Sequence, residues 1–151
     1  MVSTSTTSER TADERAILAV LDGLRRAHHE KDAAAIAACY AADAVICDLS
    51  PPLAHYGVDV AAKQEWLDGW AGPIEIEPGE TSLTVDGDLA VLHGYTQMSG
   101  TPNAAGRRIS FWLRDTICLR RRAGEWRIAH LHSSVPFHMD GSLRPAFDLQ
   151  P

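Results

Sequence analysis

Hydrophobic residues recur at helical spacing in the first part of the chain. After Thr11-Ala-Asp-Glu14, which has the Ser/Thr-x-x-Glu form of a capping box, apolar side chains fall three or four positions apart as far as Ala27. Side chains spaced in this way share one face of a helix. The pattern therefore predicts an amphipathic helix that is interrupted at Lys31-Asp32.

Two shorter helices are predicted farther along. Asp32 can cap a helix over residues 33–40, because its side chain can accept a hydrogen bond from a free backbone amide. Asp59 can cap a third helix in the same way, and Gly72-Pro73 stops it.

Strand patterns occupy most of the remaining chain. Residues 44–49 form a short apolar run rich in β-formers, and Pro51-Pro52 ends it because proline has no amide hydrogen to donate. From Ile74 onward the hydrophobic period is two, with a hairpin turn at Asp86-Gly87. Helices followed by long antiparallel strands predict an α+β fold: a cone-shaped, curved antiparallel sheet wrapped around three N-terminal helices.

The last predicted hairpin, over residues 107–136, carries the main candidate site. Gly124 suits the left-handed position that ends a three-residue loop, and such a loop sets the pairing of the two strands. The expected pairs on one face are Thr116 with His130, Arg114 with His132, and Trp112 with Ser134. The other face receives the apolar residues Leu113, Ile117, Leu119, Ala129 and Leu131.

The polar face of this hairpin has two interpretations. A mixture of Trp, Arg, His, Ser and Thr is what the wall of a concave ligand site requires, and an indole has little reason to face open water. On this interpretation the six residues line one internal pocket. The alternative is an ordinary solvated sheet face.

Composition limits the class of protein. The chain has 151 residues, 45% of them hydrophobic and 23% charged, and its apolar runs are shorter than the roughly 20 residues of a membrane span. A net charge of -6 argues against nucleic acid and membranes as partners. We expect a frayed tail over residues 1–12, one domain over 13–139 and a C-terminal tail over 140–151. The start lacks a signal-peptide pattern, so we expect a cytoplasmic protein.

The three cysteines, Cys39, Cys47 and Cys118, are odd in number, lie in apolar contexts and lack C-x-x-C spacing. These features favour reduced core residues. No metal site is expected: His130 and His132 are spaced like two ligands, but a third would have to come from Asp48, His55 or His93 without a supporting spacing rule, and Arg114 would repel a cation. The other interpretations of the two histidines are buried structural hydrogen-bond partners, or groups that bind or protonate a ligand.

The order of elements and several motifs resemble the nuclear transport factor 2-like superfamily, in particular its SnoaL-like and ketosteroid isomerase-like proteins. The resemblance covers about residues 13–137. It is carried by Tyr40-Ala-Ala-Asp-Ala44 leading to Asp48, by Gly57, by Trp112-x-Arg-x-Thr116 and by the ending Trp126 to Pro136. It implies the cone fold and a homodimer formed through the sheet. It does not define one activity, because the superfamily includes enzymes, binding modules and assembly domains.

Asp48 is the residue to which the resemblance gives a chemical role. Ketosteroid isomerases follow a similar tyrosine-containing segment with an aspartate general base, and Asp48 lies at the matching distance from Tyr40. The isomerase oxyanion hole is not reproduced, because the position of its tyrosine holds Leu24 and its protonated acid has no secure match near Asp115 or Thr116. The acid/base carboxylate of SnoaL-like cyclases has no assigned position in this chain either.

An ion pair between Arg114 and Asp48 would conflict with the role of Asp48 as a general base. A buried guanidinium must be paired, so its partner is expected to be Asp48 or an anionic ligand. Pairing with Asp48 would lower the pKa of that carboxyl and make it a poor base.

Aromatic residues are expected at the mouth of the cone. Tyr40, Trp66 and Trp70 can stack on a flat ligand, although aromatics at helical spacing are more often core. His55 lies in the loop before the third helix, where a lid can sit. The face taken by His93, Tyr95 and Gln97 is left open.

These residues predict a small cofactor-independent enzyme that acts on a hydrophobic carbonyl compound by acid/base proton transfer, as an isomerase, cyclase or dehydratase. Asp48 or one histidine would move the proton, and Arg114 with the other histidine would hold negative charge. One alternative is a binding module for a small anionic or aromatic ligand. Another is an assembly domain that uses Leu113, Ile117, Leu119 and Leu131 as its contact surface.

Overall fold

The computed structural model describes residues 10–151, so most of the predicted frayed tail lies outside the described residues. Three helices come early in the chain: α1 (Ala12–Glu30), α2 (Ala33–Ala38) and α3 (Val60–Asp68). The strands are β1 (Tyr40–Cys47), β2 (His55–Tyr56), β3 (Trp70–Asp86), β4 (Leu89–Pro102), β5 (Ile109–Arg122) and β6 (Glu125–Ser134). Within residues 10–151, no helix is long and apolar enough to cross a membrane.

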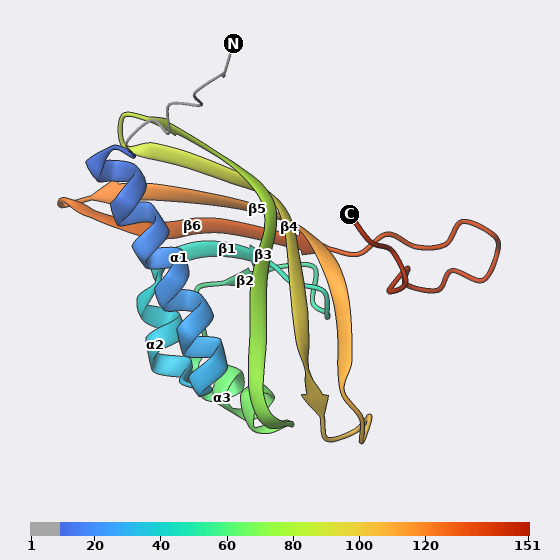
Figure 1. Ribbon diagram of the computed structural model, residues 1–151. Coiled ribbons are helices and arrows are strands. Elements are labelled where there is room, and N and C mark those ends of the chain that lie inside the picture. Colours follow the sequence, from blue (N-terminus) through green and yellow to red (C-terminus); the bar gives the residue numbers. More distant parts are fainter. Residues whose placement is uncertain (1–9) are drawn as a thin grey trace, which may run out of the picture.

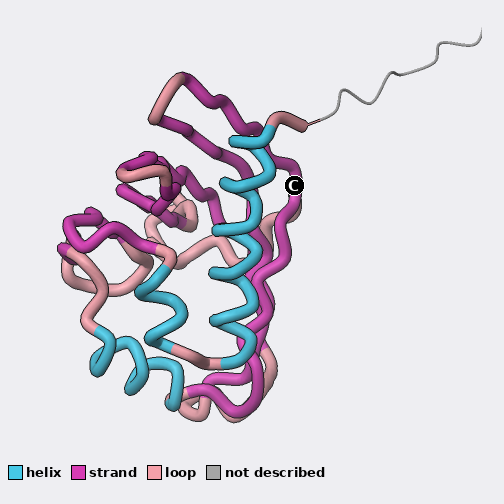
Figure 2. Tube along the Cα trace, turned by 90° about the vertical axis from the view of Figure 1, so that its left-hand side faces the viewer, coloured by secondary structure: helices cyan, strands magenta, loops and turns pink. Residues whose placement is uncertain are grey.

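All six strands form one bent sheet in the order β2-β1-β6-β5-β4-β3. β1 runs parallel to β6, and every other neighbouring pair is antiparallel. Figure 1 shows the long strands bending past the three helices, and the turned view in Figure 2 has strands on both sides of α1. The predicted α+β cone is confirmed.

The local signals of the first helix act as predicted. The Thr11 hydroxyl accepts a hydrogen bond from the Glu14 amide at 3.1 Å, and the Glu14 carboxylate accepts one from the Thr11 amide at 2.9 Å. Both halves of the capping box are therefore present. The helix ends at Glu30, and its C-cap residue Lys31 has a left-handed φ of 58°.

Two predicted helix ends were placed two to four residues too far along the chain. Tyr40 begins β1 instead of ending the second helix, and Trp70 begins β3 instead of continuing the third. In both places pairing with a distant strand decides the conformation: Tyr40 pairs with Ile128, and Trp70 pairs with Pro102. Such long-range pairing overrides the local helical pattern.

The hairpin between β5 and β6 closes through two residues, not the predicted three. Ala123 and Gly124 both have positive φ, 50° and 79°, as a tight two-residue loop with right-handed strand twist requires. A bulge at Ala129 then shifts the register between Cys118 and Leu119. Thr116 consequently pairs with His132, and Arg114 pairs with Ser134. The predicted set of residues still shares one face, but Arg114 and His132 are offset by one pair along the strands.

The hydrophobic core lies between the helices and one face of the sheet, which we call the inner face. α1 packs mainly against β3. The side chains with almost no exposed surface come from both layers: Ile17, Ile36, Leu67, Ile74, Leu119 and Ile128. The opposite face of the sheet is called the outer face below.

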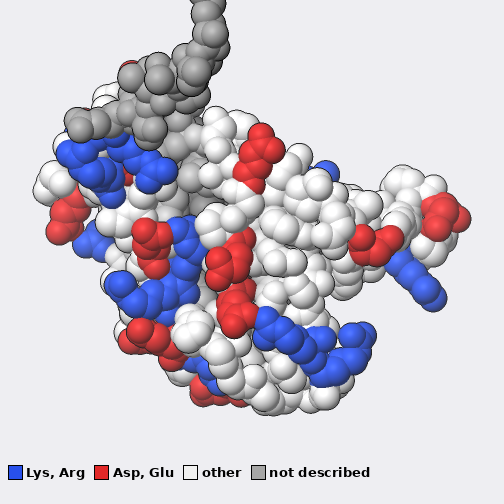
Figure 3. All heavy atoms as spheres, viewed as in Figure 1, with Lys and Arg blue, Asp and Glu red and all other residues white. Residues whose placement is uncertain are grey.

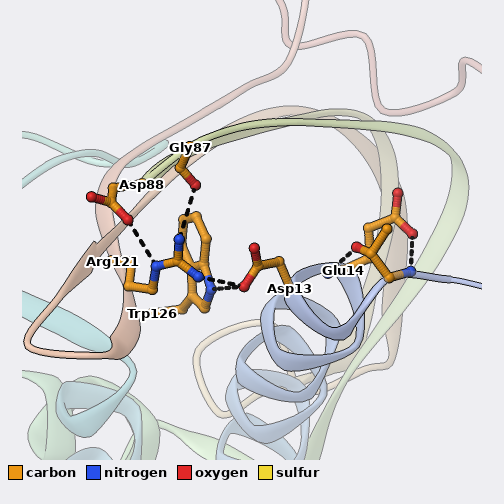
Figure 4. Close-up of polar contacts among 7 residues, drawn as sticks. Asp13, Glu14, Gly87, Asp88, Arg121 and Trp126 are labelled. Carbon is orange, nitrogen blue, oxygen red and sulfur yellow. Dashed lines mark hydrogen bonds and ion pairs between the residues drawn. The ribbon is translucent and has the colours of Figure 1, made fainter.

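A polar cluster joins the start of α1 to both long hairpins (Figure 4). The Arg121 guanidinium donates to Asp13 at 2.6 Å and to Asp88 at 2.8 Å, and the Trp126 indole N–H donates to the same Asp13 oxygen at 3.3 Å. The guanidinium carbon also lies 5.1 Å from the centre of the Trp126 ring. This cluster orients α1 across the sheet and so helps to position the residues of α1 that face the interior.

The chain after β6 leaves the body and then returns to it, as the red segment in Figure 1 shows. Phe137 bridges to Pro145, and the Ala146 amide donates to Pro136 O at 2.8 Å. In the view of Figure 3, charges of both signs are scattered over the main body and also occur on this segment. Its return brings Phe147 against Phe111, with ring centres 4.5 Å apart.

Candidate functional site

A cavity of about 740 Å³ lies between α1, α3, the inner face of the sheet and the returning C-terminal segment. This volume is in the range of sites that enclose small organic ligands. Most of its wall is apolar, including Leu18, Leu21, Leu24, Ile46, Leu92, Met98, Phe111, Leu113, Ile117 and Leu131. A ligand inside would therefore be mainly hydrophobic.

A row of polar side chains crosses this apolar wall. Asp115 of β5 pairs with Ser133 of β6, and Cys47 pairs with His132, so Asp48 at the end of β1 comes beside Ser133. The Ser133 hydroxyl donates to the Asp115 carboxylate at 2.5 Å. All three residues line the cavity. Two carboxyl groups, one on β5 and one directly after β1, thus line one largely apolar space.

Burial raises the pKa of Asp115, because a carboxylate loses solvation inside the protein. Hydrogen bonds from Ser133 and Thr96 act in the opposite direction, and the nearby charge of Asp48 raises this pKa further. Asp115 therefore holds a proton more readily than an exposed aspartate. In its protonated form it can donate a hydrogen bond inside the cavity.

Asp48 is half-buried and differs from Asp115 in its surroundings. Within residues 10–151, its carboxylate makes neither a side-chain hydrogen bond nor an ion pair. It is therefore available to accept a hydrogen bond or a proton from a molecule in the cavity. Its charge reaches the other polar groups, since it acts on His28, Tyr40 and Asp115.

Tyr40 and His28 complete the polar part of the cavity. Tyr40 is 9% exposed, and burial followed by the charge of Asp48 raises the pKa of its phenol, which keeps the hydroxyl protonated as a donor. Burial also lowers the pKa of His28 to about 4, against weaker opposing effects of the Leu24 carbonyl and Asp48. His28 is therefore a neutral imidazole near pH 7.

Five predicted site residues do line the cavity: Tyr40, Asp48, His55, Trp66 and Trp70. Trp66 and Trp70 meet edge to face with ring centres 5.5 Å apart, and the Lys63 ammonium lies 4.8 Å from the centre of the Trp66 ring. These contacts place two indoles and one cation at the α3 side of the cavity. Their role in binding a ligand stays a prediction.

The predicted polar wall lies on the wrong side of the sheet. The six residues placed there, Trp112, Arg114, Thr116, His130, His132 and Ser134, all point to the outer face. Arg114, Thr116 and His132 are exposed, and the nearest side-chain partner of Arg114 is the Ser134 hydroxyl at 3.2 Å. His130 Nδ1 forms a hydrogen bond with the Val45 carbonyl oxygen at 2.8 Å. The alternative of a solvated sheet face describes Arg114, Thr116 and His132, whereas Trp112, His130 and Ser134 are half-buried on the same face.

The reversal has a simple physical cause. Alternation along a strand determines which side chains share a face, but the helices decide which face becomes the interior by covering the more apolar one. Leu113, Ile117, Leu119 and Leu131 therefore point inward, so the expected use of these residues as an external contact surface was wrong. His93, Tyr95 and Gln97 join Thr116, Arg114 and Trp112 on the outer face.

The expected ion pair between Asp48 and Arg114 is not formed. Asp48 lines the cavity and Arg114 is exposed on the outer face, so the sheet separates the two charges. No ion pair joins them. The Asp48 carboxylate thus stays available to a molecule in the cavity.

Several residues that line the cavity were missed by the sequence interpretation, among them His28, Asp115, Ser133 and Phe147. A usable signal existed for two of them. Asp115 is the charged residue within the apolar alternation Phe111, Leu113, Ile117 and Leu119, and His28 continues the helical spacing of Leu21 and Leu24. A polar residue at a core position is more informative than a polar residue on a polar face. Phe147 had no such signal.

Metal binding finds no support in the geometry of the described chain. Over residues 10–151, no group of three or more His, Cys, Asp or Glu side chains is arranged to hold a metal ion. The three cysteines are free thiols.

A bent sheet that encloses an apolar cavity with buried carboxyl groups defines a class of cone-shaped α+β proteins. The sequence profile of the SnoaL-like domain matches residues 17–138, and this chain belongs to that family. A comparison with curated proteins gives no significant match.

Solved structures agree with this assignment. An NTF2-like protein of unknown function from Pseudomonas putida KT2440 is 28% identical, with a TM-score of 0.79 over 94% of this chain and 99% of that chain. A putative ketosteroid isomerase from Shewanella frigidimarina NCIMB 400 is 23% identical, with a TM-score of 0.62 over 79% of this chain and 94% of its own. A hexachlorocyclohexane dehydrochlorinase, LinA type 2, is 14% identical, with a TM-score of 0.69 over 86% and 95% of the two chains. The last two similarities concern the fold alone.

Proposed function

We propose that this protein is a small enzyme that moves a proton on a hydrophobic carbonyl compound, with Asp48 as the general base. The observation that carries the proposal is the unpaired Asp48 carboxylate inside an apolar cavity that also holds Asp115. A base needs a free lone pair within reach of the substrate, and partial exclusion of water strengthens its interactions. The names of the fold relatives, which include a putative ketosteroid isomerase and a dehydrochlorinase, are compatible with this chemistry.

The reaction begins when Asp48 removes a proton from the carbon next to the carbonyl group. The electron pair of the broken C–H bond moves toward the carbonyl oxygen, which becomes an enolate. Protonated Asp115 and the Tyr40 hydroxyl are the donors available in the cavity to stabilise that oxygen. Asp48 then returns the proton to another carbon in an isomerisation, or the enolate expels a leaving group in an elimination.

Arg114, His130 and His132 have no part in this proposal, because they lie on the outer face of the sheet. The Asp48 part of the sequence hypothesis is retained. Asp115 and Tyr40 replace the arginine and histidines as the groups that face negative charge.

Deuterium exchange tests the proposal before the natural substrate is known. A panel of bicyclic ketones such as 2-tetralone would be incubated with the protein in D2O, and deuterium at the α-carbon would be measured by NMR. We expect the wild type to accelerate exchange and Asp48→Asn to slow it by about 10²-fold or more. Asp43→Asn is the matched control, since Asp43 is an exposed aspartate of β1 that pairs with Arg122 outside the cavity. Equal exchange by Asp48→Asn and the wild type would remove Asp48 from the mechanism.

A binding module remains the second candidate, because the apolar lining and volume of the cavity suit ligand capture without chemistry. Calorimetry with the same ketones separates the two functions. Tight binding without α-exchange by the wild type, across the whole panel, would favour the binding module.

A further inference from the structure

His28 contributes a hydrogen-bond acceptor to the cavity that the proposed reaction does not use. Its Nδ1 lies 2.9 Å from the Leu24 carbonyl oxygen. A carbonyl oxygen can only accept, so Nδ1 carries the hydrogen in this contact. In a neutral imidazole with one N–H, the other nitrogen, Nε2, bears a lone pair.

The lone pair of Nε2 has no partner in the described part of the chain. Among residues 10–151, His28 makes one side-chain hydrogen bond, which is the one through Nδ1. Trp112 Nε1 also lacks a partner among these residues, but it has almost no accessible surface. Nε2 of His28 differs from it because some of its surface remains accessible. His28 lines the cavity, so a molecule inside the cavity lies next to this imidazole.

The surroundings of His28 keep its imidazole neutral. Burial is the main effect that disfavours protonation, and the Lys63 ammonium from α3 adds to it. Asp48, at the end of β1, acts in the opposite direction but does not compensate for burial. Nε2 therefore remains an acceptor at neutral pH, whereas an imidazolium would be a donor.

We propose that His28 Nε2 binds a hydroxyl group of the ligand, so that the substrate class is a hydrophobic carbonyl compound that also carries a hydroxyl. This inference rests on the proposed function and makes its substrate more specific. The cavity offers donors from Tyr40 and, when it is protonated, from Asp115, which match a carbonyl oxygen, and a separate acceptor from His28, which matches a hydroxyl. A ligand that lacks the hydroxyl would leave Nε2 desolvated and unpaired.

A matched pair of probes tests the hydroxyl subsite. 2-Naphthol and 2-methoxynaphthalene share one ring system, but the naphthol alone carries a donor. We expect the wild type to bind 2-naphthol about 3- to 10-fold more tightly in calorimetry, as one net hydrogen bond allows. His28→Phe keeps an aromatic ring and should reduce this ratio to about one. His28→Gln supplies a carbonyl acceptor and should restore part of the preference.

Asp48 is the competing acceptor, and Asp48→Asn controls for it. If His28 holds the hydroxyl, Asp48→Asn keeps the preference for 2-naphthol. Loss of the preference in Asp48→Asn together with its retention in His28→Phe would overturn the proposal. Equal binding of both probes by the wild type would also overturn it. Circular dichroism of each variant confirms that it is folded before binding is compared.

NMR of protein labelled with ¹⁵N-histidine gives a readout that does not depend on stability. We expect His28 to show a protonated Nδ1 and an unprotonated Nε2, and the Nε2 resonance to move on addition of 2-naphthol but not of 2-methoxynaphthalene. If the chemical shift of Nε2 did not change on addition of 2-naphthol, the subsite would be refuted. Neither probe has an exchangeable α-carbon next to a ketone, so this result is independent of catalysis. Failure of α-exchange with an intact His28 effect would reject the enzyme proposal and leave the subsite standing.

Discussion

Acidification tests the buried state of His28 directly. The ordinary pKa of 6.5 describes the unfolded chain, and burial lowers the pKa in the folded protein to about 4. Between these values the unfolded state binds a proton that the folded state does not. The unfolding free energy therefore falls as the pH falls through this window, and the contribution of neutral His28 is fully present only above pH 6.5.

The size of this loss follows from the two pKa values. One pKa unit corresponds to about 1.4 kcal/mol, so the full difference between 6.5 and about 4 corresponds to about 3 kcal/mol. Integration gives a loss of about 1 kcal/mol at pH 5.5 and about 2–3 kcal/mol at pH 4.5, relative to pH 7.5. Such a loss is a large fraction of the stability of a small domain.

The measurement compares wild type with His28→Phe by urea unfolding at pH 7.5, 6.5, 5.5 and 4.5. Taking the difference between the two proteins cancels the effects of other groups, among them Asp115, whose raised pKa changes stability in the opposite direction. We expect His28→Phe to gain stability relative to wild type as the pH falls. His29→Phe is the control for the introduction of a phenylalanine, because His29 is the exposed neighbour on the same helix. Parallel curves for His28→Phe and wild type would show that His28 titrates as an exposed histidine and would refute its burial.

Four other predictions concern separate parts of the molecule. Arg121→Met should lower the urea midpoint, since Arg121 connects Asp13 to Asp88, whereas Arg120→Met, an exposed neighbour, should not; equal midpoints would discount the cluster. Asp115→Asn should gain stability relative to wild type as the pH rises from 4 to 8, because the raised pKa makes ionised Asp115 unfavourable in the folded state; a constant difference in unfolding free energy would contradict this. Phe147→Ala should weaken 2-naphthol binding in calorimetry, because Phe147 lines the cavity against Phe111, while Phe137→Ala, on the exposed part of the same segment, should leave it unchanged. Light scattering should give about twice the 16.4 kDa mass of one chain, as a homodimer through the outer sheet face requires, and Tyr95→Asp should yield a monomer; a wild-type monomer at micromolar concentration would reject this prediction.

Local patterns were sufficient for much of the architecture. The capping box at Thr11, the end of the first helix near Lys31 and the alternation of the last strands each depend on neighbouring residues, so they are legible without tertiary contacts. Asp48 was also found from the sequence, because the segment from Tyr40 to Asp48 carries both a strand pattern and a family resemblance. The resemblance further indicated the cone, which no single helix or strand pattern defines.

Register and sidedness were decided only by the tertiary structure. The sequence pattern contains no mark of the bulge at Ala129, which offsets the shorter loop and keeps Arg114 and His132 on one face. The pattern separated the two faces of the hairpin correctly, but a mixed polar face is equally suited to a pocket and to water. The helices cover the apolar face because that burial removes most hydrophobic surface from solvent. Asp115 and His28 therefore gain their chemical importance from being enclosed, whereas the more conspicuous Arg114 and His132 remain outside.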